Sequence, residues 1–442
     1  MNNDYRVWQD FNNISVEVKI DNIKYNSIWY VENERLKLKI DCTKNIEKFD
    51  RNINIIDIIN GKILKDGTKV AFINCFHYGM QSLGVGKNEY IYSIYRIDRV
   101  FLGTNLKNMQ VKKISACKVV YQSIEDFFND KIFNVNFTSQ NVQIIPFCKK
   151  HKYNKDNLNF EVLSSIEENE DEGFIRLNKE IVVYLKSNKK VCFDDVMKKI
   201  YTFRNLMMIL LKRNVIVKKQ TLKINDKEYE LFDCDNHEIK RENENLRSQL
   251  IFRNVKYEDI EDFNHVLEKF NLIYERICPL LELLYNAYSN KLPNLNRFLD
   301  AITMIEYYSR EFDNAEALKL TNIKLVRQGK NERDEPEFRD RVKSLIINAN
   351  EVLKFSESEI DEISKNVKDG RTYYVHYVKN GWKLSHDKLF RYYNFLEDII
   401  LLNIYKLIGI NITQNEYITY LNFYYTKQEL LNREEKWVWT TV

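Results

Sequence analysis

An arginine and a histidine with four residues between them, Arg371 and His376, form the sharpest chemical signal in the sequence. Histidine exchanges a proton near neutral pH, and arginine provides a fixed cation that stabilises negative charge as it develops in a reaction. Since the chain contains six histidines, about one match to an R-x(4–6)-H spacing is expected by chance. The spacing alone therefore leaves open that Arg371 is a surface cation and His376 a polar residue on a helix face.

An acidic residue within an apolar stripe is a candidate partner for this pair. In the helix predicted to follow Pro293, projection at about 100° per residue places Glu306 inside the stripe rather than opposite it. A carboxylate buried there without a partner would cost several kcal/mol, so we expect a cation to meet it and take Arg371 as the candidate. The stripe consists of Leu295, Phe298, Leu299, Ile302 and Ile305.

The segments that would position these residues have a helical period from about residue 256 onward. Apolar residues recur at alternating spacings of three and four between Phe263 and Leu284, with Pro279 as an expected kink. Further helices are predicted over Asn294 to about Phe312, over about 339–350, from Ser356, and from a cap at Ser385 to about Leu407. A polar segment over 322–338 separates two of them. The back half is thus predicted to be an antiparallel helical bundle.

The front half has a different pattern. Six of the eleven glycines precede residue 104, and they separate short alternating or β-branched segments that predict strands. A second group of strands follows residue 155, with the acidic run EENEDE read as a loop, and then one amphipathic helix over 194–213. The fold class predicted is α+β and multidomain, with a β-rich N-terminal half and an all-α C-terminal bundle.

Four regions are expected along the chain. They are a β-rich domain over 1–155, strands with one amphipathic helix over 156–250, a helical domain over 256–410 and a C-terminal extension over 411–442. The charged stretch 237–249 is a candidate hinge between the two halves.

Composition narrows the class of protein. The net charge of +4 tolerates an anionic partner without indicating one. Seven scattered cysteines without a C-x-x-C pair favour reduced thiols over a zinc site, so no metal is expected. The N-terminus resembles no signal peptide, and no apolar run reaches the length of about 18 residues that a membrane span needs. These features predict a cytoplasmic protein that does not contact a membrane.

The segment VKDGRTYYVHY, together with FLDAITMIEYY and FRDRVKSLI, resembles the HEPN superfamily and in particular its Apea-like branch. The resemblance covers about residues 257–410. The β-rich front is similar to the N-terminal domain that accompanies this branch in prokaryotic anti-phage proteins. One departure is Thr372, where many members have asparagine, although its hydroxyl could replace part of the hydrogen bonding of that amide.

The resemblance implies a metal-independent and cofactor-independent endoribonuclease of anti-phage, abortive-infection defence, active as a homodimer formed through the helical domain. RNA supplies its 2′-hydroxyl as the nucleophile, so His376 would transfer the proton and Arg371 would stabilise the phosphate charge. Glu306 and Thr372 would support them. Tyr374 and Tyr377, like Tyr373, could stack on unpaired bases, but packing in a core or interface is expected at least as often.

Partners and alternatives follow from the same resemblance. The implied partners are RNA, with tRNA or another structured RNA as candidates, and a phage-derived trigger at the N-terminal half. Two other readings stay open: a catalytically silent HEPN-like module that binds RNA or protein, and the toxin of a toxin–antitoxin pair. Residues five apart on an ideal helix are separated by about 140° and about 7.5 Å, so two copies of the motif are expected to converge on one phosphate more readily than one.

Overall fold

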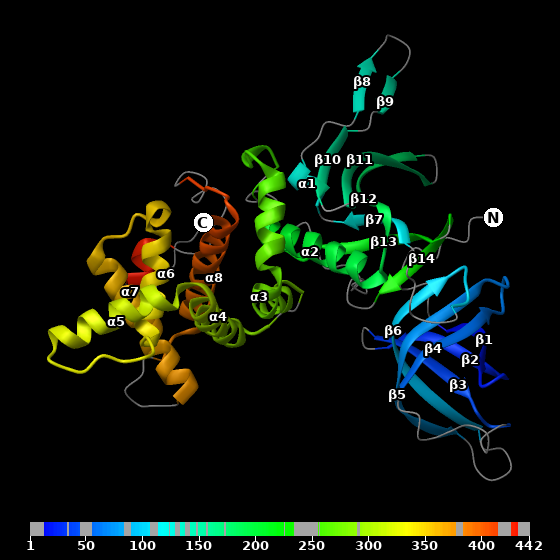
Figure 1. Cartoon of the computed structure of the whole chain (residues 1–442), viewed down its shortest axis with the longest axis horizontal. Helices are drawn as coiled ribbons and strands as arrows, with labels where there is room; N and C mark the ends of the chain where they lie inside the picture. The colour runs from blue at the N-terminus through cyan, green and yellow to red at the C-terminus, as the bar shows by residue number, and fades with distance from the viewer. Residues whose placement is uncertain are drawn as a thin grey trace. The chain divides into compact units, whose positions relative to one another are not determined.

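The computed structural model of the chain separates into two compact units (Figure 1). The first comprises residues 1–201 and 215–246, and the second comprises residues 202–214 and 247–442. No helix among the described residues is both long and apolar enough to cross a membrane. The structure describes residues 13–32, 35–44, 55–83, 90–106, 114–122, 124–128, 133–137, 142–146, 149–155, 158–171, 174–224, 226–233, 255, 257–289, 292–376, 383–413 and 426–431.

Six antiparallel strands at the front of the first unit close into a ring. They occur in the order β6-β3-β2-β1-β4-β5, and β5 pairs again with β6. Alternate side chains point inward, and Trp29, Phe72 and Tyr95 are almost fully buried at the centre. The strands are β1 (Ile14–Ile20), β2 (Ile23–Glu32), β3 (Arg35–Asp41), β4 (Ile55–Ile63), β5 (Lys69–Leu83) and β6 (Tyr90–Leu102).

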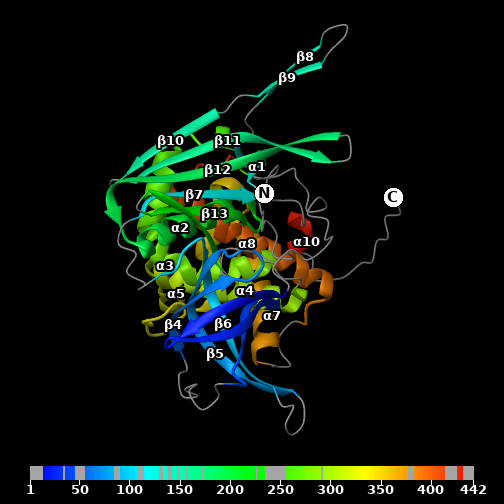
Figure 2. The same ribbon diagram turned by 90° about the vertical axis from the view of Figure 1, so that its right-hand side faces the viewer.

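The remaining strands extend this sheet from β6 in the order β14-β13-β7-β12-β11-β10. Strands β8 and β9 form a separate hairpin that projects from the sheet in both views (Figures 1 and 2). These elements are β7 (Ile114–Gln122), α1 (Glu125–Phe128), β8 (Phe133–Phe137), β9 (Val142–Pro146), β10 (Lys149–Lys155), β11 (Leu158–Asp171), β12 (Phe174–Val191), β13 (Ile216–Ile224) and β14 (Lys227–Asp233).

One expectation for this region was wrong. The acidic run EENEDE was expected to be a loop, but its residues Glu167 to Asp171 belong to β11. They pair with residues of β12. Ladder hydrogen bonds with a long neighbouring strand outweigh the low strand propensity of acidic residues. The candidate hinge over 237–249 lies outside the described residues.

The predicted amphipathic helix is α2 (Phe193–Leu211), and it contributes to both units. Its first turns belong with the strands, where Tyr121 donates its hydroxyl to the carbonyl of Ile200. Its last turns belong with the helices, where Tyr405 donates its hydroxyl to the carbonyl of Ile209 at 2.6 Å. Both halves of the helix have an apolar buried side, so one continuous helix contributes residues to the cores of both units.

The second unit is helical, as predicted. The polar segment is shorter than expected and begins at Gln328, because α5 continues to Arg327. Ser356 and Ser385 cap α7 and α8, and each hydroxyl accepts a backbone N–H three residues further on. The elements are η4 (Tyr257–Asp259), α3 (Phe263–Ser289), α4 (Asn294–Tyr308), η5 (Ser309–Asp313), α5 (Asn314–Arg327), α6 (Phe338–Leu353), α7 (Glu357–His376), α8 (His386–Ile408) and α10 (Lys427–Leu431).

Candidate active site

Arg371, near the end of α7, forms the expected ion pair with Glu306 of α4. Its Nε donates to Oε1 of Glu306 at 3.0 Å, and its Nη2 lies 2.7 Å from the same oxygen. The two side chains are 24% and 25% exposed, so the pair is sheltered but still open to solvent on one side. The carboxylate in the apolar stripe is therefore satisfied by a cation from another helix.

His376 is the last residue of α7 and is exposed. Its Nε2 lies 3.4 Å from Nη1 of Arg371, a contact that is a hydrogen bond only when Nε2 carries no proton. The separation of about 140° between positions five apart on an ideal helix does not keep the two side chains from meeting. The arginine side chain is long enough to span the last turn of the helix, so a single chain brings both groups together.

An aromatic ring supports the guanidinium of Arg371 from a third helix. The Cζ atom of Arg371 lies 4.7 Å from the centre of the Phe338 ring, at the first residue of α6. Three contacts from three elements thus restrict Arg371: the carboxylate of Glu306, the ring of Phe338 and the imidazole of His376. Such restriction reduces the reorganisation needed when an anion binds.

Close packing just before the arginine fixes this end of α7. Gly370 is buried, and a Cβ at this position would lie 2.8 Å from Cδ1 of Leu384 and 3.4 Å from Cζ of Phe298. Tyr374 donates its hydroxyl to the carbonyl of Leu384 at 2.6 Å, one turn further on. A glycine inside a helix costs about 1 kcal/mol relative to alanine, and here it allows two side chains to approach the backbone beside Arg371.

The other supporting residues of the motif are placed as follows. Thr372 donates its hydroxyl to the carbonyl of Lys368 at 2.8 Å, so it bonds to its own helix rather than to the ion pair. Tyr374 is partly buried against Tyr373 and Phe298. Burial raises the pKa of its phenol. Its contacts are those of a packing residue, whereas Tyr377 lies outside the described residues.

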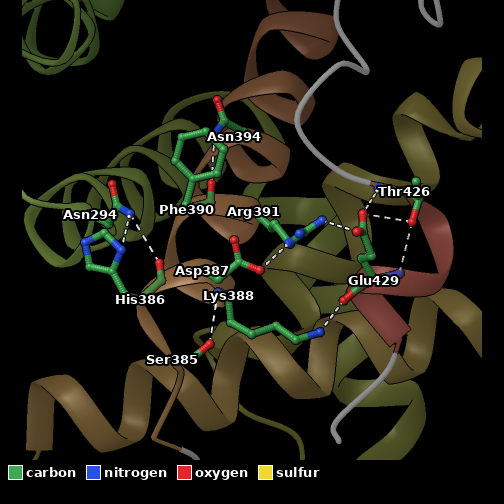
Figure 3. Close-up of polar contacts among 10 residues, drawn as sticks. All are labelled: Asn294, Ser385, His386, Asp387, Lys388, Phe390, Arg391, Asn394, Thr426 and Glu429. Atoms are coloured by element: carbon green, nitrogen blue, oxygen red, sulfur yellow. Dashed lines mark hydrogen bonds and ion pairs between the residues drawn. The ribbon is translucent and has the colours of Figure 1, made fainter. Parts of the chain in front are cut away.

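Polar contacts at the start of α8 connect it to α4 and to the C-terminal segment (Figure 3). Asn294, at the first turn of α4, donates to the carbonyl of His386 at 3.2 Å and lies 3.2 Å from Nδ1 of its ring. Arg391 contacts the carboxylates of Asp387 and Glu429, and Lys388 donates to the carbonyl of Glu429. Helix α4 carries Glu306, and helix α8 follows the motif. These contacts therefore hold the two helices together at their N-termini.

Sequence reasoning missed Phe338, Leu384 and Gly370. The isolated glycine was the available signal for the last two, because a glycine within a helical pattern indicates close packing. Nothing in the sequence around Phe338 distinguishes it from an ordinary apolar residue of a helix start.

Comparison with protein families agrees with this architecture. The family model for ApeA N-terminal domain 1 matches residues 23–270, and the model for Apea-like HEPN matches residues 299–414. The second range contains Glu306, Phe338, Arg371 and His376. No curated protein and no solved structure matches the chain significantly. The chain belongs to the ApeA family, with an ApeA N-terminal domain 1 followed by an Apea-like HEPN domain.

Proposed function

We propose that this protein is a metal-independent endoribonuclease that acts in the cytoplasm as an effector of anti-phage defence. The observation that carries the proposal is the arrangement around Arg371. Glu306 occupies the Nε and Nη2 side of the guanidinium, while Nη1 lies beside His376 at the exposed end of α7. Family membership supports the same role, because HEPN domains are often ribonucleases and ApeA proteins belong to anti-phage defence.

In the proposed reaction His376 is the general base, and Arg371 is the cation that stabilises the charge developing on the phosphate. Unprotonated Nε2 of His376 accepts the proton of an RNA 2′-hydroxyl, and the 2′-oxygen forms a bond to the adjacent phosphorus. The bond from phosphorus to the 5′-oxygen breaks, and this oxygen leaves with a proton from an acid or from water. The products are a 2′,3′-cyclic phosphate and a 5′-hydroxyl. Nη1 of Arg371 moves from His376 to the phosphate, since Glu306 holds the opposite side of the guanidinium.

The assembly and partners proposed are a homodimer through the helical domain, with tRNA or another structured RNA as substrate. A second copy of the motif would supply the acid for the leaving oxygen and a second cation for the phosphate. The N-terminal unit would respond to a phage-derived trigger. Activity that falls on dilution would support the dimer, and undiminished specific activity of a monomer would contradict it.

The test is cleavage of total RNA by the purified full chain in excess EDTA. We expect His376→Ala and Arg371→Ala each to reduce the cleavage rate by about 100-fold or more, because one removes proton transfer and the other charge stabilisation. His265→Ala and Arg327→Ala are matched controls, since both residues are exposed in the same unit, and they should cleave at the wild-type rate.

Cleavage that stops on chelation, or that persists in His376→Ala, would contradict the proposal. A wild-type chain that binds RNA without cutting it under all conditions would also contradict it and would favour the silent binding module. Cleaved ends without a 2′,3′-cyclic phosphate or a 3′-phosphate would exclude the 2′-hydroxyl as nucleophile.

A further inference from the structure

The chain departs from the α-helix at Ser309, less than one turn after Glu306. Residues Ser309–Asp313 form a π-helical turn, η5, between α4 and α5. Such a turn accommodates an extra residue within a helix and occurs frequently at functional sites. The backbone N–H of Ser309 donates to the carbonyls of Glu306 and Ile305, so the turn is bonded directly to the residue that holds Arg371.

A buried arginine from α6 joins the two ends of this turn. Nη1 of Arg341 donates to Oγ of Ser309 at 3.2 Å and to Oδ1 of Asn314 at 3.1 Å. Arg341 is 4% exposed and Ser309 is fully buried. Both acceptors are neutral side chains. They offset less of the cost of burying the arginine cation than a directly bonded carboxylate would.

The electrostatic surroundings of Arg341 connect it with the candidate site. Burial is the strongest influence and lowers the pKa of Arg341, Arg310 acts in the same direction, and the carboxylates of Glu335, Glu306 and Asp313 oppose them. Asp313 is itself buried at the end of the turn, where Oδ1 accepts from Asn348 of α6 at 2.8 Å. Arg341 and Asn348 are seven residues apart, so one face of α6 holds both ends of the turn.

We propose that Arg341 is a positioning residue for the candidate active site, acting through Ser309 on Glu306 and through Glu306 on Arg371. This inference rests on the proposed function. The connection runs from Arg341 to Ser309 at 3.2 Å, from Ser309 to the carbonyl of Glu306, from Glu306 to Arg371 at 2.7 Å and from Arg371 to His376 at 3.4 Å. Without Arg341 the π turn loses its side-chain bonds at Ser309 and Asn314, and the Glu306 carboxylate no longer has one fixed position.

The experiment measures RNA cleavage by the full chain carrying Arg341→Met, alone and combined with Glu306→Gln. We expect kcat to fall about tenfold with KM unchanged within about twofold, because the change disturbs positioning rather than RNA binding. In the Glu306→Gln background, Arg341→Met should change kcat by less than about twofold, since the residue it acts through is already altered. A general loss of stability would instead reduce activity equally in both backgrounds.

Matched variants separate positioning from folding. Arg339→Met changes an arginine of the same helix that contacts Asp361 of α7 instead of the turn, and it should leave kcat near the wild-type value. The variant Ser309→Ala/Asn314→Ala removes the two acceptors while keeping the arginine. If Arg341→Met does not fold, kcat is measured on this variant instead. Arg341→Lys keeps the charge and should restore part of kcat.

The outcomes distinguish this inference from the proposed function. A folded Arg341→Met protein with wild-type kcat, or fully multiplied losses in the double variant, would overturn the positioning role while leaving the nuclease proposal standing. If the wild-type chain cuts no RNA, the nuclease proposal fails, and crystal structures of the wild type and Arg341→Met decide the inference instead. Loss of the contact between Arg371 and Glu306 in the variant would support positioning, and its retention would overturn it.

Discussion

Two cation–carboxylate pairs of the helical unit, Arg371–Glu306 and Lys212–Asp398, use similar chemistry in different surroundings. Nζ of Lys212 lies 2.5 Å from Oδ1 of Asp398 and 3.6 Å from Oε1 of Glu397. Lys212 is 15% exposed and Asp398 only 1%, whereas both partners of the other pair are about a quarter exposed. Enclosure therefore distinguishes the two pairs, although both join segments that are distant in the chain.

The enclosed pair is surrounded by further polar groups of the same unit. Burial alone would lower the pKa of Lys212, but attraction by Asp398 and Glu397 raises it above its ordinary value. Tyr288 donates its hydroxyl to Glu397 at 2.7 Å and completes the surroundings of the two acids. The open pair differs because, among the described residues, the polar side chain beside Nη1 of Arg371 is an exposed imidazole. Under the proposed function, the cation with an exposed partner binds substrate, whereas the cation beside two buried acids stabilises the fold.

The largest effect we predict comes from breaking the enclosed pair. Lys212→Met should lower the free energy of unfolding of the helical unit by about 3–5 kcal/mol, because it leaves Asp398 buried without its cation. The measurement is urea unfolding followed by circular dichroism at 222 nm. Adding Asp398→Leu to Lys212→Met should recover much of the loss. If Lys212→Met lowered the free energy of unfolding by less than about 1 kcal/mol, the enclosed pair would not differ from the open pair in its contribution to stability.

The second prediction concerns the acid of the open pair. Glu306→Gln should lower RNA cleavage by about 10- to 100-fold, because the neutral amide no longer holds the guanidinium in one position. The same change should alter the free energy of unfolding by less than about 1 kcal/mol, as is usual for pairs that solvent reaches. Parallel assays of cleavage and urea unfolding check both parts. A large loss of stability with activity intact would reverse the roles assigned to the pairs.

The smallest predicted effect is a pH dependence from Asp313, a buried acid whose Oδ2 has no hydrogen-bond partner among the described residues. Burial is the main cause of its raised pKa. The folded state therefore binds this proton more tightly than the unfolded state, so stability should increase as pH falls from the raised pKa toward the ordinary value. Thermal unfolding measured as the pH falls from about 7 to the ordinary pKa of 3.8 should show this increase weakened in Asp313→Asn. Identical slopes in both proteins would show that Asp313 is ionised as easily as an exposed acid.

Local signals in the sequence predicted several features of this site. The starts of α7 and α8 were predictable because Ser356 and Ser385 cap them in the expected way. The contact between Glu306 and Arg371 was predictable because an acid in an apolar stripe requires a cation.

Two features without a local signal were not predictable. The π turn at Ser309–Asp313 is held by Arg341, 32 residues further along the chain, and its own sequence carries no signal for it. Closure of the front strands into a ring depends on the second pairing of β6 with β5, which is set by register and side-chain packing rather than by local propensity.

The helix α2 has a consequence for how the protein could be divided. The chain passes from one unit to the other three times, near residues 201, 214 and 246, so residues 202–214 remain part of the helical unit. A single proteolytic cut near residue 250 would not release an intact helical unit, since the piece carrying Lys212 stays attached to the strands. Recombination at one point between genes would divide the helical core in the same way. The two units are therefore expected to be inherited, exchanged and degraded together.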